Sequence, residues 1–116
     1  GVKVNNQQNL NAMVKYWGDL VDQIAFVDYM PWENVYKSKY SEVQTPCSDL
    51  WRRMFVWWDG KVNPCDVDYK SKLSVGNINN SNISELWKSD DYKKLRQRHE
   101  SKLRNDTFPC NRCVLV

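Results

Sequence analysis

Residues 53–65, RMFVWWDGKVNPC, carry the clearest structural pattern in the chain. Two runs of apolar residues flank the pair Asp59-Gly60, and Asp-Gly is favoured in two-residue hairpin turns, where both positions take positive φ. The stretch therefore predicts a β-hairpin. A hairpin does not require a thiol, yet Cys65 stands at the end of its second strand. Its presence there raises the question of what the cysteines of this chain bind.

Large apolar side chains occupy both faces of the predicted hairpin. Because side chains alternate along a strand, the two faces carry Phe55 and Trp57 on one side and Met54, Val56 and Trp58 on the other. We therefore expect the hairpin to be covered by other parts of the protein on both sides.

The segment before the hairpin has the order strand, helix, strand. GVKV opens the chain as a short strand, and NLNAMVKYW follows with apolar residues at helical spacing: Leu10, Met13, Val14 and Trp17. The run from Gln23 to Tyr29 is a mostly apolar second strand. This order predicts a βαβ unit with parallel strands, and one such unit cannot cover a sheet alone. We expect residues 1–43 to comprise the remnant of a larger body and a connector.

The segment after the hairpin is predicted to be helical. Asn82 and Glu85 form the pattern of a capping box, and Ser89 is the cap of a second helix. Apolar and aromatic residues of that helix repeat on one face: Tyr92, Leu95, His99 and Leu103. We interpret His99 as a partly buried helix residue, not as a base or a ligand. The whole pattern indicates an α+β fold.

Composition and charge narrow the class of protein. The chain has 116 residues and a net charge of +3 from 17 basic and 14 acidic residues, an excess too small to argue for a nucleic-acid partner. Mean hydropathy is −0.73, and no apolar run reaches the length of a membrane span. The N-terminus lacks the pattern of a signal peptide, which favours a cytoplasmic, reducing environment. The basic residues between Lys88 and Arg104 are interpreted as a solvated helix face.

The chain contains four cysteines, at positions 47, 65, 110 and 113. The last two form a C-x-x-C pair, whose spacing lets both sulfurs converge on one centre, and two distant thiolates would complete a tetrahedral set. In a reducing compartment such a set is more often metal-binding or catalytic than disulfide-bonded. From spacing alone, four readings remain open: two disulfides, a structural zinc ion, an iron–sulfur cluster, and free or redox-active thiols.

Several landmarks together resemble one known family. Cys47, Gly60 and Cys65 follow the pattern C-x12-G-x4-C, and residues 109–113 read PCNRC. Between them, VGNINNSNISELWKSDDYKKLRQRH (residues 75–99) is similar to the family's Gly-Asn-Ile, Ser-x-x-Glu-Leu-Trp and Leu-Arg landmarks. The order of these landmarks resembles the SPASM/twitch domain found at the C-terminus of many radical S-adenosylmethionine enzymes.

The resemblance implies a cofactor and its ligands. It implies that residues 44–116 are a β-hairpin plus helices around one auxiliary 4Fe–4S cluster, held by Cys47, Cys65, Cys110 and Cys113. Three residues follow the last cysteine, so the single-cluster twitch form fits better than the two-cluster form. Residues 1–43 would then hold the end of a partial TIM-like barrel.

The chain does not contain the whole of such an enzyme. The C-x3-C-x2-C motif that holds the radical-generating cluster is absent from these residues, as is a glycine-rich segment for S-adenosylmethionine. The chain is therefore not catalytically complete alone. We expect S-adenosylmethionine and a second 4Fe–4S cluster in the missing barrel portion of the same protein, which is then its partner.

The resemblance implies that the chain is the C-terminal part of a radical S-adenosylmethionine oxidoreductase or maturase. Because four cysteine ligands leave no open iron site, the auxiliary cluster is expected to transfer electrons. The substrate would be a peptide, a sugar or another small molecule. In a barrel the active site forms at the C-terminal ends of the strands, which makes four residues candidates for the substrate side: Asn5, Tyr29, Trp32 and Glu33. The alternative is a non-catalytic zinc-binding interaction module, supported by the basic helix from Lys93 to Arg104 and by tryptophans expected to be exposed.

Overall fold

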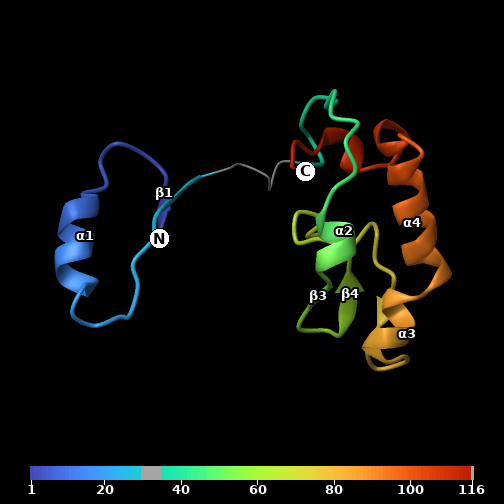
Figure 1. Ribbon diagram of the computed structural model, residues 1–116, viewed down its shortest axis with the longest axis horizontal. Helices are drawn as coiled ribbons and strands as arrows, with labels where there is room; N and C mark the ends of the chain where they lie inside the picture. Colours follow the sequence, from blue (N-terminus) through green and yellow to red (C-terminus); the bar gives the residue numbers. More distant parts are fainter. Residues whose placement is uncertain (30–34, 116) are drawn as a thin grey trace. The chain divides into compact units, whose positions relative to one another are not determined.

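The computed structural model describes residues 1–29 and 35–115, and the chain divides into two units, Gly1–Pro31 and Trp32–Val116 (Figure 1). In the described residues, the first unit holds β1 (Val2–Lys3), α1 (Leu10–Trp17) and β2 (Val27–Asp28). The second unit holds α2 (Asp49–Arg52), β3 (Phe55–Val56), β4 (Lys61–Asn63), β5 (Gly76–Asn77), α3 (Ile83–Trp87), α4 (Asp90–Glu100), and the 3-10 helices η2 (Arg104–Asp106) and η3 (Cys110–Arg112). Residues 35–43, assigned above to a connector, belong to the second unit.

The first unit has the predicted order of strand, helix and strand. β1 and β2 pair in parallel, with Val2 opposite Val27, and α1 connects them. Asn9 caps α1, because its side-chain oxygen accepts a hydrogen bond from the Ala12 amide at 2.9 Å. The assignment of this unit to a partial barrel stays a prediction.

The first unit differs from a self-contained domain in two ways. The strand expected over Gln23–Tyr29 is reduced to Val27–Asp28, since β1, its partner in the described residues, offers only two residues for pairing. The apolar stripe of α1 is also uncovered in the described residues: no residue of the helix is buried, and Trp17 is 48% exposed.

The turn of the hairpin differs from the one predicted. The Trp57 amide donates to the Lys61 carbonyl at 2.8 Å, and the Gly60 amide donates to the Trp57 carbonyl at 2.9 Å, which closes a three-residue loop. Gly60 takes a φ of +81°, whereas Asp59 stays at negative φ and accepts the Lys61 amide on its side chain at 3.1 Å. The two-residue turn was wrong because a three-residue loop needs a left-handed residue only at its last position.

The face of the hairpin that carries Met54 and Val56 is covered only in part. Val62 of β4 pairs with Val56 and is fully buried, and Met54 packs against the core, whereas Val56 is 40% exposed and Trp58 is 98% exposed. Trp58 lies in the loop between the strands, where the alternation of strand side chains no longer applies. The prediction that both sides are covered was therefore wrong at Val56 and Trp58.

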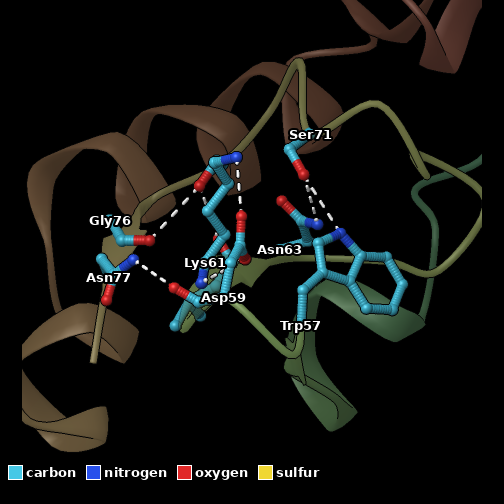
Figure 2. A network of polar contacts seen from close by, with 9 residues as sticks. Trp57, Asp59, Lys61, Asn63, Ser71, Gly76 and Asn77 are labelled. Atoms are coloured by element: carbon cyan, nitrogen blue, oxygen red, sulfur yellow. Dashed lines mark hydrogen bonds and ion pairs between the residues drawn. The ribbon is translucent and has the colours of Figure 1, made fainter. Parts of the chain in front are cut away.

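Polar contacts join the hairpin to the segments that follow it (Figure 2). Trp57 Nε1 and Asn63 Nδ2 both donate to the hydroxyl oxygen of Ser71, at 3.0 and 2.9 Å. Asn77 of β5, which completes the antiparallel sheet β3-β4-β5, donates its side-chain amide to the Asp59 carbonyl at 3.0 Å. These contacts hold both ends of β4 in place.

Replacing Gly60 by alanine is expected to lower the free energy of unfolding by about 1–2 kcal/mol, because an L side chain is strained at φ +81°. Gly60→Asn is the matched control. In either variant the new Cβ would lie 2.5 Å from Asn77 Oδ1, but asparagine tolerates the left-handed region better than alanine. Urea unfolding followed by circular dichroism measures both variants. Equal losses would contradict the backbone explanation.

The helices begin as predicted. The Glu85 amide donates to Asn82 Oδ1 at 2.9 Å and the Asn82 amide donates to Glu85 Oε2 at 3.1 Å, which confirms the capping box of α3. Tyr92, Leu95 and His99 form the buried face of α4. Leu103 does not continue that face, since α4 ends at Glu100 and Leu103 is 41% exposed.

The core of the second unit lies where β4 meets α3 and α4. Buried side chains from these elements and from the residue before β5 form one cluster, Val62, Val75, Leu86 and Tyr92. The Tyr92 hydroxyl donates to the Arg53 carbonyl at 2.8 Å, which ties α4 to the start of the hairpin. The core thereby fixes the end of β4 relative to α4, and both elements contribute to the site described next.

Candidate metal centre

Four cysteine side chains from three segments of the second unit line one cavity. Cys47 precedes α2, Cys65 follows β4 by two residues, and Cys110 and Cys113 lie at the start and just after the end of η3. All four thiols are free of disulfides. The structure thus brings together the four cysteines that the sequence singled out as one set.

The rest of the cavity lining is mostly apolar. It includes Val35, Leu50, Pro64, Val67, Leu73 and Pro109. Burial in this lining raises the pKa values of Cys65 and Cys110 to about 12, with smaller contributions from neighbouring negative groups. Four thiolates are therefore unfavourable in this cavity unless a cationic group shares it, which is the role that iron or zinc performs in a cysteine site.

The donor set by itself suits two kinds of metal centre. Four thiolates can hold one zinc ion, each at about 2.3 Å from the metal, or an iron–sulfur cluster. Among residues 1–29 and 35–115, no three His, Cys, Asp or Glu side chains are grouped closely enough to hold one metal ion.

The Cys47 loop is held against α4. The Cys47 amide donates to Nδ1 of His99 at 3.2 Å, and the Leu50 amide donates to the Cys47 carbonyl at 3.3 Å as the chain enters α2. His99 is fully buried, and burial, together with the positive charges of Arg104 and Arg98, lowers its pKa to about 4. The imidazole is therefore neutral at pH 7.

A buried arginine joins the Cys47 loop to the C-x-x-C segment. Arg104 is 1% exposed, and its guanidinium donates to the carbonyls of Thr45 at 2.8 Å, Cys113 at 3.0 Å and Leu115 at 2.6 Å. A longer contact of 3.5 Å reaches the carbonyl of Cys110. One side chain thereby holds the backbone before Cys47 against the backbone of the C-x-x-C segment. Among the described residues, no carboxylate pairs with it.

A buried carboxylate shapes the loop after Cys65. Asp68 is fully buried; its two oxygens accept the backbone amides of Lys72 at 3.0 Å and Leu73 at 2.7 Å. The Tyr36 hydroxyl also donates to Asp68, and burial together with this hydrogen bond raises the pKa of Tyr36 well above its usual value. Tyr36 thereby ties the first described residues of the second unit to the Cys65 loop.

Two of the candidates for the substrate side, Asn5 and Tyr29, lie in the first unit. Asn5 and Tyr29, which follow β1 and β2, line the same shallow depression with residues of both strands. Parallel pairing explains this proximity, because the C-terminal ends of parallel strands lie at one edge. Trp32 and Glu33 lie outside the described residues.

The sequence interpretation missed the polar residues that support the cysteines. Arg104 was grouped with a solvated basic face, and Asp68 and Tyr36 were assigned no role. A signal existed for two of them. Arg104 stands beyond the end of the amphipathic helix and six residues before Cys110, and Asp68 opens a loop in which an aspartate can accept amides farther along the chain.

Comparison with known proteins agrees with this site. Residues 47–114 match the SPASM family, described as an iron–sulfur cluster-binding domain, and this match covers more than half of the chain. A relative from Niallia circulans, S-adenosyl-L-methionine-dependent 2-deoxy-scyllo-inosamine dehydrogenase, is 32% identical over 54 residues, or 47% of this chain. The chain spans 22% of that relative's length. No solved structure matches the chain.

The described residues contain no helix that is both long and apolar enough to cross a membrane. This finding agrees with the low mean hydropathy of the sequence.

Proposed function

Because the chain belongs to the SPASM family of iron–sulfur cluster-binding domains, we propose that its four cysteines together bind one auxiliary [4Fe–4S] cluster in a radical S-adenosylmethionine enzyme. The observation that carries the proposal is the meeting of Cys47, Cys65 and the Cys110–Cys113 pair around one apolar cavity. The family match and the relative support the iron–sulfur cofactor and the class of enzyme. The ligand set, the cluster type and the number of clusters are proposed.

The residues of the cavity suit a redox centre. When bound, the cluster supplies one-electron transfer. Four thiolates leave no open position for a substrate, so the four cysteines serve to anchor and insulate the centre. The apolar lining excludes water, and Arg104 contributes positive charge beside the thiolates, which favours the reduced state. We propose electron transfer, and not substrate binding, as the role of this site.

The parent protein is proposed to be an oxidoreductase or maturase that acts in the cytoplasm. The relative's printed name is that of a dehydrogenase, which supports the oxidoreductase reading. The uncovered apolar stripe of α1 fits a unit that packs against further strands and helices, as the remnant of a partial TIM-like barrel would. S-adenosylmethionine and a second cluster would bind in that barrel. The depression at Asn5 and Tyr29 would lie on its substrate side, for a peptide, a sugar or another small molecule.

Anaerobic purification and reconstitution of the chain, followed by metal and sulfide analysis, tests the proposal. We expect a brown protein with about four irons and four sulfides per chain, and Mössbauer parameters of a [4Fe–4S] cluster. Reconstitution in the presence of equimolar zinc controls for replacement of the cluster by the commoner ion. A colourless chain with about one tightly bound zinc, under anaerobic conditions with iron in excess, would overturn the proposal in favour of a zinc-binding interaction module.

A further inference from the structure

His99 lines the cysteine cavity and has a ring nitrogen that makes no hydrogen bond with the described residues. The side chain is fully buried on the inner face of α4 and lines the same cavity as the four cysteines. Its Nε2 atom is buried and has no hydrogen-bond partner among the described residues. Buried polar atoms are nearly always paired, so an unpaired one in a residue that lines a ligand cavity indicates a partner that this part of the chain does not supply.

The other ring nitrogen determines where the proton of His99 resides. Nδ1 accepts the amide hydrogen of Cys47 at 3.2 Å. A nitrogen that accepts a hydrogen bond cannot itself carry a proton, so the neutral ring is protonated at Nε2. The unpaired atom is therefore an N–H group, and its missing partner is an acceptor.

The cavity offers few protein acceptors for that N–H group. Asp68 is the carboxylate in the described lining, and its two oxygens already accept the Tyr36 hydroxyl and the amides of Lys72 and Leu73. The remaining lining consists of apolar side chains, the Arg104 guanidinium and the four cysteines. Among the side chains in this lining, the sulfur atoms are thus the acceptors left.

We propose that Nε2–H of His99 donates a hydrogen bond to a sulfur of the bound cluster, either an inorganic sulfide or a cysteine thiolate, and raises the reduction potential of the cluster. The proposal rests on the proposed function. A hydrogen bond to sulfur is stronger when the cluster carries the additional negative charge of its reduced state, so the bond favours reduction. His99 thereby has two roles on its two nitrogens: Nδ1 holds the Cys47 loop, and Nε2 tunes the centre.

Two variants separate these roles. His99→Asn places an oxygen near the position of Nδ1, which keeps an acceptor for the Cys47 amide and removes the donor into the cavity. His99→Gln places an amide NH₂ near the position of Nε2 and keeps that donor. In the reconstituted full chain, redox titration is expected to give a reduction equilibrium constant at least tenfold lower for His99→Asn, or a potential about 59 mV lower. His99→Gln is expected to stay close to the parent chain.

A second measurement does not depend on any variant. His99 is the single histidine of the chain, so labelling with ¹⁵N-histidine marks this ring alone. Pulsed electron paramagnetic resonance of the reduced cluster is expected to detect a weak ¹⁵N coupling. A coupling as large as that of an iron-bound nitrogen, or none, would overturn the proposal.

Iron and sulfide analysis before each titration separates failure of this proposal from failure of the proposed function. A parent chain without iron and sulfide refutes both. A chain loaded with its cluster whose potential is the same with histidine and asparagine at position 99 refutes the hydrogen bond alone.

Discussion

The double variant Cys65→Ser, Cys110→Ser is expected to bind iron at least about 100-fold more weakly than the parent chain. Two thiolates would remain, Cys47 and Cys113, and neither a four-iron nor a three-iron cluster is retained well by two cysteines. The stability that the cluster adds would disappear as well. A site loaded at about 1,000 times its dissociation constant stabilises the folded chain by about 4 kcal/mol, and the variant should show no such gain. Anaerobic iron analysis and urea unfolding, with and without reconstitution, measure both effects.

A packing change in the same cavity is the control for this double variant. Val67 lines the cavity and is 4% exposed, so Val67→Ala is expected to cost roughly 2 kcal/mol of stability while leaving all four thiols in place. It should therefore retain the iron and the gain in stability on loading. Full iron content in the double variant, or loss of iron in Val67→Ala alone, would contradict the assignment of Cys65 and Cys110 as ligands.

Replacing Arg104 by leucine is expected to lower the free energy of unfolding of the second unit by about 3 kcal/mol or more. The change removes the donor shared by the carbonyls of Thr45, Cys113 and Leu115, and an unpaired buried carbonyl costs about 1–3 kcal/mol. Loss of this contact also frees the Cys47 loop from the C-x-x-C segment, so the variant should bind the cluster more weakly. Urea unfolding followed by tryptophan fluorescence, before and after reconstitution, tests both consequences.

Two further variants separate the hydrogen bonds of Arg104 from its charge. Arg104→Lys keeps the charge, but an ammonium lacks the planar fork that reaches several carbonyls, so an intermediate loss is expected. Lys94→Leu removes one positive charge from an exposed side chain, 72% exposed beside Asp91 at 3.9 Å, and should change stability by less than about 0.5 kcal/mol. Equal losses for Arg104→Leu and Lys94→Leu would show that the hydrogen bonds of Arg104 contribute nothing.

Local patterns in the sequence predicted β3, β4, α3 and α4 of the second unit, but not α2, β5 or the two 3-10 helices. The capping box at Asn82, the second cap at Ser89 and the buried face through Tyr92, Leu95 and His99 all agree with the structure. These features depend on residues within a few positions of one another, so the sequence contains the whole interaction. The turn was predicted wrongly because the same residue pair is compatible with two loop lengths. Asp59-Gly60 fits both a two-residue and a three-residue loop, and the structure contains the three-residue loop.

The contacts that hold the cysteine segments in place could not be predicted from local patterns. Arg104 contacts Thr45 across 59 positions, and the Cys47 amide meets His99 across 52. A basic residue near a helix end is usually solvated, and nothing local distinguishes one that is buried. The neighbours that make Arg104 a structural residue come from the opposite end of the unit.

The sequence by itself determined the set of four cysteines, the family, the hairpin and the two helices α3 and α4, because thiol identity, turn residues and helix caps are local properties. The tertiary structure alone decided what surrounds those thiols. The packing of β4 against α3 and α4 brings Cys65 to the same apolar cavity as Cys47 and the C-x-x-C pair, and it buries Nε2 of His99 without a partner among the described residues. Burial and long-range contacts depend on the packing of distant segments, and packing creates the low-polarity environment that raises the pKa values of the Cys65 and Cys110 thiols.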